Sequence, residues 1–184
     1  MDLQDFEYSS MYFNEDMSAE VEILINQAAE MYGTDMAENF LLKAYAMAPE
    51  NLAVIVALYR YYYYQHDYTA ALKTAGKAMQ AAGSKLGLPD DWRNITEPHL
   101  GSAALVSMGL LRFYLLALKG ASYLSLRLNN IESGLEMLSK LTELDPFDRL
   151  HVKFLLDMAL EKSSITNNSN IVSIRGYSEF AVSK

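Results

Sequence analysis

Small residues and helix breakers recur along the first half of the chain with a period of 34 residues. The matching positions, taken in pairs, are Ala37 and Ala71, Ala44 and Ala78, and Pro49 and Gly83. Repetition at a fixed period of this length is typical of solenoids, in which each unit buries its apolar face only against its neighbours. This repeat constrains the fold class more than any other feature of the sequence.

The residues at these positions resemble the tetratricopeptide repeat, a helix-turn-helix unit whose second helix is closed by a proline. A first unit covers about 18–51 and closes at Pro49, and a second unit follows without a gap over about 52–85. A third unit ends in "NNIESGLEMLSKLTELDPFD", with Gly134 at the small position and Pro146 as the closing proline. The resemblance covers roughly 100 residues.

The units depart from the family pattern at several positions. Val21 and Ala28 stand where the family often has Trp and Tyr, Gly83 replaces a closing proline, and Ser125 replaces a Tyr. Helical periodicity supports the same architecture independently, because apolar residues recur every three and four positions in "AENFLLKAYAM" and "GLEMLSKLTEL". The sequence therefore predicts stacked antiparallel helix pairs.

A stretch rich in helix breakers separates the second unit from the third and predicts an insert loop over about 83–101. The breakers are Gly83, Gly87, Pro89 and Pro98. The only tryptophan, Trp92, lies in this loop, where it either pins the loop to the helices or anchors a partner. After the loop we expect a helix over about 102–128, with a kink near Gly109 or Gly120.

The two ends of the chain differ from the repeat region. "FDRLHVKFLLDMALEK" predicts a capping helix, whereas "IVSIRGYSEFAVSK" alternates as a strand does. The predicted organisation is an acidic and aromatic segment at 1–17, a helical repeat domain at 18–160 and a polar tail at 161–184. The expected fold class is all-α, and the resemblance implies a tetratricopeptide-like right-handed repeat of about three helix-turn-helix units plus the capping helix.

The chain is acidic and contains no cysteine. Its formal net charge of −8 repels nucleic-acid phosphates, so nucleic acid is not expected as a partner. Without cysteine, disulfides and thiolate metal sites are excluded. The stretch "MDLQDFEYSSMYFNEDMSAE" is acidic where a secretory signal is basic and then apolar, which favours a cytoplasmic location.

The most apolar run, 102–126, is long enough to cross a membrane. Arg112 and Lys119 lie two turns apart within it and therefore share one stripe of a helix. This pattern favours a largely buried helix with one wet edge, and no membrane span is expected.

Residue patterns that would indicate an enzyme are weak. The three histidines lie far apart and outside metal-ligand spacing: His66, His99 and His151. No nucleophile elbow, phosphate-binding glycine loop or dinucleotide fingerprint occurs. We therefore expect no catalysis, no cofactor and no metal. An enzyme or small-molecule-binding protein remains an alternative only if a pocket forms near Asp90, Asp91 and His99.

The resemblance implies a binding groove along the first helix of each unit. The partner-binding residues that it predicts are Asn26, Arg60, Tyr63, Tyr64, Lys119, Tyr123 and Arg127, with Trp92 as a further contact in the loop. The four consecutive tyrosines at 61–64 cannot share one helical face. We expect Tyr62 to pack inside, Tyr61 to lie beside the adjoining helix, and Tyr63 and Tyr64 to face the groove.

The predicted groove carries positive charge in an acidic protein. Arg60, Lys119 and Arg127 would form a basic strip, and arginine grips carboxylates with two hydrogen bonds. Glu22 stands where the carboxylate clamps of this family have Lys, so that specificity is not carried over. The expected partner is a peptide or protein segment of acidic character. The alternative is that the tyrosines pack on the loop or the tail and the charges form a solvated face.

These observations favour a non-enzymatic protein-protein interaction module, an adaptor or chaperone-like protein. The alternative is a permanent structural or assembly subunit of a larger complex, which would use the apolar helix at 103–126 and the ten methionines as its interface. A further hypothesis is that the acidic and aromatic segment at 1–16 occupies the groove, or reaches a second copy and forms a homodimer.

Overall fold

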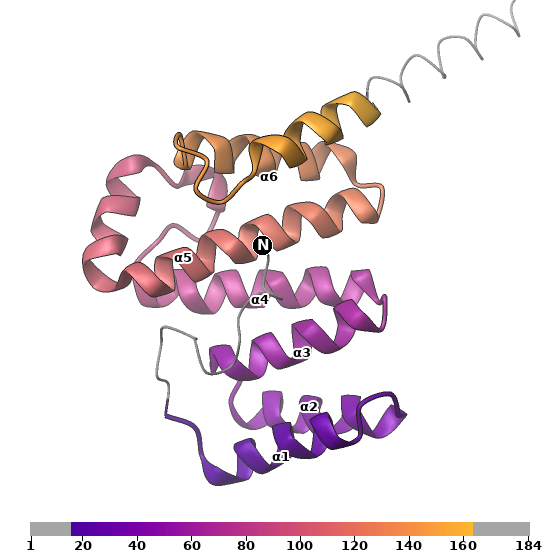
Figure 1. Ribbon diagram of the computed structural model, residues 1–184. Helices are drawn as coiled ribbons and strands as arrows, with labels where there is room; N and C mark the ends of the chain where they lie inside the picture. Colours follow the sequence, from indigo (N-terminus) through magenta and orange to yellow (C-terminus); the bar gives the residue numbers. More distant parts are fainter. Residues whose placement is uncertain (1–15, 164–184) are drawn as a thin grey trace, which may run out of the picture.

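The computed structural model describes residues 16–163, which form helices joined by turns and loops, without a strand in that part of the chain (Figure 1). The elements are α1 (Ala19–Glu30), α2 (Asp35–Met47), α3 (Leu52–Tyr64), α4 (Tyr68–Leu86), η2 (Trp92–Asn94), α5 (Glu97–Arg127), α6 (Ile131–Leu144) and a helical stretch at 153–163. The all-α prediction is confirmed over these residues. The segment 1–15 and the tail at 164–184, with its predicted strand-like alternation, lie outside them.

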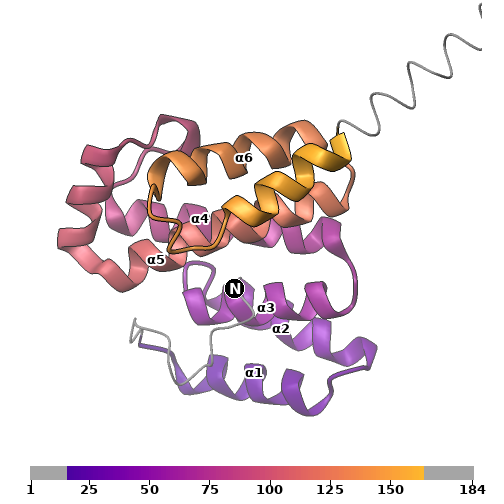
Figure 2. The same cartoon turned by 45° about the horizontal axis from the view of Figure 1, so that its top comes forward.

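The helices stack in the order of the chain. Each of the six α-helices packs against the next one, from α1 on α2 to α5 on α6. The stack runs from α1 and α2 at one end to α6 and the helix at 153–163 at the other (Figures 1 and 2). Short connections join α1 to α2, α3 to α4 and α5 to α6, and such connections make sequential helices antiparallel neighbours.

Two of the three hairpins are closed by the same turn. The α3–α4 turn places His66 in the left-handed region at φ 60°, and the α5–α6 turn places Asn129 there at φ 63°. The following amide donates back across the helix end in both, from Asp67 to the Tyr62 carbonyl at 3.0 Å and from Asn130 to the Ser125 carbonyl at 2.8 Å. This is the hydrogen-bond pattern of a helix C-terminus that stops in a left-handed residue.

The predicted small positions are buried between packed helices. Ala37, Ala44, Ala71 and Ala78 are fully buried. Gly134, at the corresponding place in α6, is buried against α5, where an added Cβ would lie 2.7 Å from Leu126 Cδ2. The spacing in the sequence therefore located the helix contacts.

Gly134→Ala is expected to lower the free energy of unfolding by about 1 kcal/mol, because overpacking outweighs the gain in helix propensity. Gly76 provides the matched control, since it is exposed within α4 and an added Cβ would meet nothing within 4 Å. Gly76→Ala is expected to raise stability by about 0.5–1 kcal/mol. Urea unfolding of both variants checks this pair, and equal effects would contradict the close contact at Gly134.

The connection between α4 and α5 is shorter than the sequence predicted. Gly83 does not break α4; it lies inside the helix, where an added Cβ would be 3.2 Å from Tyr114 Cε2. The helix ends at Leu86, before Gly87 at φ 66°. Pro98 lies in the first turn of α5, where backbone amides have no partner within the helix. The missing N–H of proline therefore costs no hydrogen bond there. The loop is therefore 87–96, with η2 inside it, and the predicted bounds of 83–101 are corrected.

Helix α5 starts earlier than predicted and bends close to one of the two expected positions. The backbone at Ser107 leaves the helical region, with φ −162° and ψ 111°, and its hydroxyl accepts a hydrogen bond from the Leu110 amide at 3.2 Å. Ser107 therefore caps a new helical segment, as serine does at helix starts. The kink expected near Gly109 is thus found at Ser107, two residues earlier, whereas Gly120 stays helical and faces the Tyr59 hydroxyl.

The bend at Ser107 exposes apolar side chains, which we call the elbow: Leu105, Val106 and Met108. Leu105 is 91% exposed. Among residues 16–163, α5 is the one helix long and apolar enough to cross a membrane. Its second half packs between α4 and α6, as the core helix of a globular protein does.

Candidate protein-binding groove

An apolar groove of about 510 Å³ lies between α1 and α3. We call it the α1–α3 groove. It is lined by Ile25, Ala28 and Ala29 of α1, by Tyr32 in the turn after α1, by Leu41 of α2 and, from α3, mainly by Val56, Ala57, Arg60, Tyr61 and Tyr64. Among the described residues that line it, Arg60 alone carries a charge.

Small side chains on both helices create this groove. Ala28 and Ala29 on α1 face Ala57 on α3, so neither helix fills the space between them. Ala28 stands where the family that the sequence resembles often has Tyr. An alanine in place of the larger tyrosine is the signal in the sequence for an open groove.

Aromatic rings form the rim of the groove. Tyr32 in the turn after α1 is 53% exposed, and Tyr64 on α3 is 52% exposed. The ring of Tyr61 meets that of Tyr32 edge to face, with centroids 6.4 Å apart, and so connects α3 to the turn after α1. Rigid aromatic rings beside a single arginine suit the binding of a protein segment, because little side-chain freedom is lost on contact.

A second aromatic surface joins α3, α4 and α5, and we call it the tyrosine cluster: Tyr63, Tyr68, Tyr123 and Arg127. The ring centroid of Tyr63 lies 6.0 Å from that of Tyr68 and 6.4 Å from that of Tyr123. The Arg127 guanidinium lies 4.9 Å from the Tyr68 ring centroid and donates to the hydroxyls of Tyr68 and Tyr123, each at 3.2 Å. The hydrogen bond to Tyr123 raises the pKa of Arg127, so this exposed arginine keeps its positive charge.

The four consecutive tyrosines on α3 face different neighbours. Tyr61 lines the α1–α3 groove, and Tyr62 packs towards α2, where its hydroxyl donates to Glu38 Oε1 at 2.9 Å. Burial, with the Glu38 contact, raises the pKa of Tyr62 well above its usual range. Tyr63 belongs to the tyrosine cluster, and its ring meets Tyr64 at 5.8 Å. This ring pair connects the groove to the cluster.

The structure divides the predicted site residues between these two surfaces. Arg60 and Tyr64 line the groove, whereas Tyr63, Tyr123 and Arg127 form the neighbouring cluster. Asn26 is exposed on α1 but is not part of the groove lining. Reasoning from the sequence missed Tyr68 and the apolar wall of α1, because the family pattern pointed to polar positions.

Lys119 does not face a groove, and that prediction is corrected. Its side chain is 7% exposed, and Nζ donates to the Leu150 carbonyl at 2.7 Å. It therefore joins α5 to the segment that leads into the helix at 153–163. Lys119, one of the three cations of the predicted basic strip, is thus a structural group in the core.

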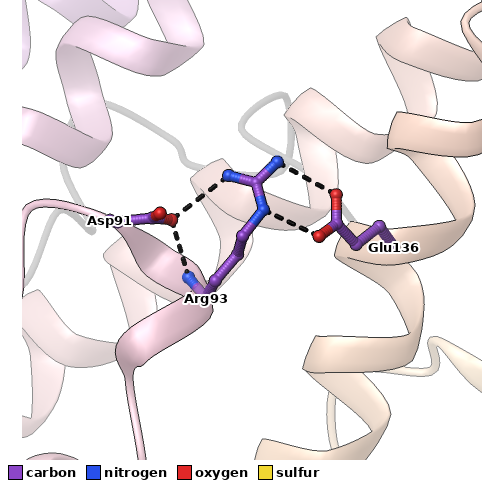
Figure 3. Close-up of polar contacts among 3 residues, drawn as sticks. All are labelled: Asp91, Arg93 and Glu136. Atoms are coloured by element: carbon purple, nitrogen blue, oxygen red, sulfur yellow. Dashed lines mark hydrogen bonds and ion pairs between the residues drawn. The ribbon is translucent and has the colours of Figure 1, made fainter.

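Trp92 is also buried, at 9% exposure, within the main hydrophobic core. The Arg93 guanidinium covers its ring at 4.4 Å from the ring centroid. Figure 3 shows Arg93 between two carboxylates, with Nε 2.7 Å from Glu136 Oε1 on α6 and Nη1 3.2 Å from Asp91 Oδ1. The loop is thus fastened to α6, and Trp92 is placed as a pin of the loop rather than as an exposed contact.

A cavity does form beside one of the three residues Asp90, Asp91 and His99. A cavity of about 510 Å³ is lined by Asp90, Trp92 and Tyr114, but neither Asp91 nor His99 lines it. His99 Nδ1 accepts from the Thr96 amide at 3.2 Å at the start of α5. Within residues 16–163, no group of three or more His, Cys, Asp and Glu side chains is placed to hold a metal ion.

Comparison with known proteins identifies a relative. A protein from Azotobacter chroococcum mcd 1, described as "Uncharacterized 19.8 kDa protein in nifW 5'region", is 49% identical over 164 residues. The match covers 89% of this chain and 92% of that protein. No protein-family model and no solved structure matches the chain.

Proposed function

This chain belongs to the family of the Azotobacter chroococcum protein in the nifW 5' region, and from that premise we propose that it is a protein-binding module without catalytic activity. It acts as an adaptor or chaperone-like protein. Its partner is a protein or peptide segment, which docks on the α1–α3 groove and the adjoining tyrosine cluster. Its location is cytoplasmic, and neither nucleic acid nor a cofactor takes part.

The architecture that we propose is a tetratricopeptide-like right-handed repeat. The three units are the hairpins α1–α2, α3–α4 and the second half of α5 with α6. The matched turns at His66 and Asn129 support it, as do the buried small residues Ala37, Ala71 and Gly134 at equivalent places. In this arrangement α1, α3 and α5 line one surface, which carries both the groove and the cluster.

The observation that carries the proposed function is an apolar groove that continues into an aromatic surface with arginines. Exposed apolar area of this kind, beside polar groups, marks interaction sites on proteins. Arg60 in the groove and Arg127 in the cluster favour a segment that presents carboxylates between apolar side chains.

The test is affinity capture from a lysate of cells that express the protein. The groove variant carries Ala29→Glu and Tyr64→Ala, and the control variant carries Thr69→Ala and Lys73→Ala on exposed positions of α4. We expect wild type and control to capture the same protein and the groove variant to lose at least about tenfold in affinity, the usual effect of removing interface anchors. Equal capture by all three, or no specific capture, would contradict the proposal. Circular dichroism confirms beforehand that both variants fold.

The elbow favours a second candidate function, that of a permanent subunit of a larger assembly. Leu105, Val106 and Met108 are exposed and do not line the groove. A lasting interface would cover these apolar side chains. Size-exclusion chromatography separates the two functions. An adaptor elutes as a stable monomer or homodimer, whereas a permanent subunit self-associates unless Leu105→Ser and Met108→Ser are introduced.

A further inference from the structure

We propose that the α1–α3 groove is occupied by the segment 1–15 of the same chain, so that a partner must displace this segment to bind. The inference deepens the proposed function by adding regulation to the same surface. It follows from the chemistry of the groove, from the composition of the segment and from the distance that the segment must cover.

The chemistry of the segment complements that of the groove. It contains four carboxylates and neither lysine nor arginine: Asp2, Asp5, Glu7 and Glu15. Between them stand six large apolar or aromatic residues: Leu3, Phe6, Tyr8, Met11, Tyr12 and Phe13. The groove offers apolar walls for such side chains and the Arg60 guanidinium for a carboxylate.

The charges of α1 define how the segment lies in the groove. Glu20, Glu22 and Glu30 are exposed on α1 and repel carboxylates. A carboxylate is therefore favoured on the α3 side of the groove, beside Arg60, and the space between Ala29 and Ala57 suits an aromatic ring. The α3 side of the groove thus suits an acidic and aromatic segment better than the outer face of α1 does.

The segment is long enough to reach every part of the groove. It leads directly into α1, whose 12 residues span only about 18 Å. Fifteen residues span about 22 Å as a helix and up to about 50 Å when extended. If the chain turns back at 16–18, before α1 begins, the segment can therefore follow the whole length of α1. Because the segment is covalently attached, its effective concentration at the groove is on the order of millimolar.

Disulfide trapping in the full chain tests this arrangement, since the natural sequence has no cysteine to interfere. One cysteine replaces Leu3, Phe6 or Tyr12 in turn, and the other replaces Ala57 or Ala29 in the groove. The control places the second cysteine at Lys73, which is exposed on α4 and does not line the groove. We expect at least one segment position to form an intramolecular disulfide about tenfold faster with a groove cysteine than with Lys73→Cys.

The alternatives give different outcomes in the same experiment. Equal rates at the groove and at Lys73→Cys would overturn the proposal. Disulfides that form only between two chains and disappear on dilution would overturn it in favour of a second copy. Arg60→Gln in the trapping variants should slow the reaction, whereas Lys77→Gln on α4 should not. Trapping needs no partner, so failure to capture a partner would count against the proposed function and leave this inference standing.

A second measurement is the fluorescence of an apolar dye added to the full chain, in which no cysteines have been introduced. Replacing Phe6, Tyr12 and Phe13 by serine removes the aromatic anchors and should release the groove. Fluorescence of an apolar dye should then rise several-fold, because such dyes bind exposed hydrophobic surface. An unchanged signal, with wild-type circular dichroism, would contradict occupancy of the groove by the segment.

Discussion

Lys119→Glu is expected to lower the free energy of unfolding by about 3–5 kcal/mol, because it buries a carboxylate against a carbonyl oxygen. In the native chain Nζ donates to the Leu150 carbonyl at 2.7 Å, and the side chain is almost fully buried in α5. The negative charge would repel that oxygen and have no donor to satisfy it. Unfolding in urea, followed by circular dichroism, measures the change.

Two further variants make this prediction specific. Lys119→Met keeps the length of the side chain but leaves the Leu150 carbonyl without its donor, for an expected loss of about 1–3 kcal/mol. Arg112→Glu reverses a charge on the exposed side of the same helix and should change stability little. If Lys119→Glu unfolds like wild type and instead loses a partner, Lys119 is a binding residue after all.

Trp92→Ala is expected to lower the free energy of unfolding by about 3–5 kcal/mol, the usual effect of removing a large buried aromatic side chain. Trp92 belongs to the main core and holds the loop 87–96 between α4 and α6. Its removal leaves a cavity beside Tyr114, which is itself deeply buried. Burial raises the pKa of Tyr114 to about 12, so its hydroxyl stays neutral there.

Controls separate the packing of Trp92 from its other contacts. Trp92→Phe keeps most of the buried surface and should lose clearly less stability than Trp92→Ala. Arg93→Ala removes the contacts to Asp91 and Glu136, which are exposed ion pairs and contribute little. Partner capture that fails with Trp92→Phe at unchanged stability would contradict the role of Trp92 as a pin.

The sequence predicted the helical pairs because their signals are local. The period of small residues located the helix contacts at Ala37, Ala71 and Gly134, and the apolar periodicity identified the helices around them. The predicted loop was too long because glycine and proline were taken as breakers wherever they occur. Gly83 instead serves close packing against Tyr114, and Pro98 begins a helix.

The candidate site was predicted only in part, because burial depends on segments that are distant in the sequence. Tyr64 and Arg60 line the α1–α3 groove, whereas Lys119 and Trp92 are buried. A lysine on an amphipathic helix looks exposed until the chain near Leu150 covers it. A lone tryptophan in a loop likewise gives no sign of whether the loop folds onto the core.

The sequence by itself determined the all-α class and the positions of the helix contacts, because helix formation and close packing of small residues follow from spacing along the chain. Only the tertiary structure decided which faces stay open. The α1–α3 groove exists because small residues, Ala28 and Ala29 on α1 and Ala57 on α3, line it from both helices, and the tyrosine cluster exists because α3, α4 and α5 converge. Whether a side chain is exposed depends on how the helices pack together, so the sequence of a single helix does not determine it.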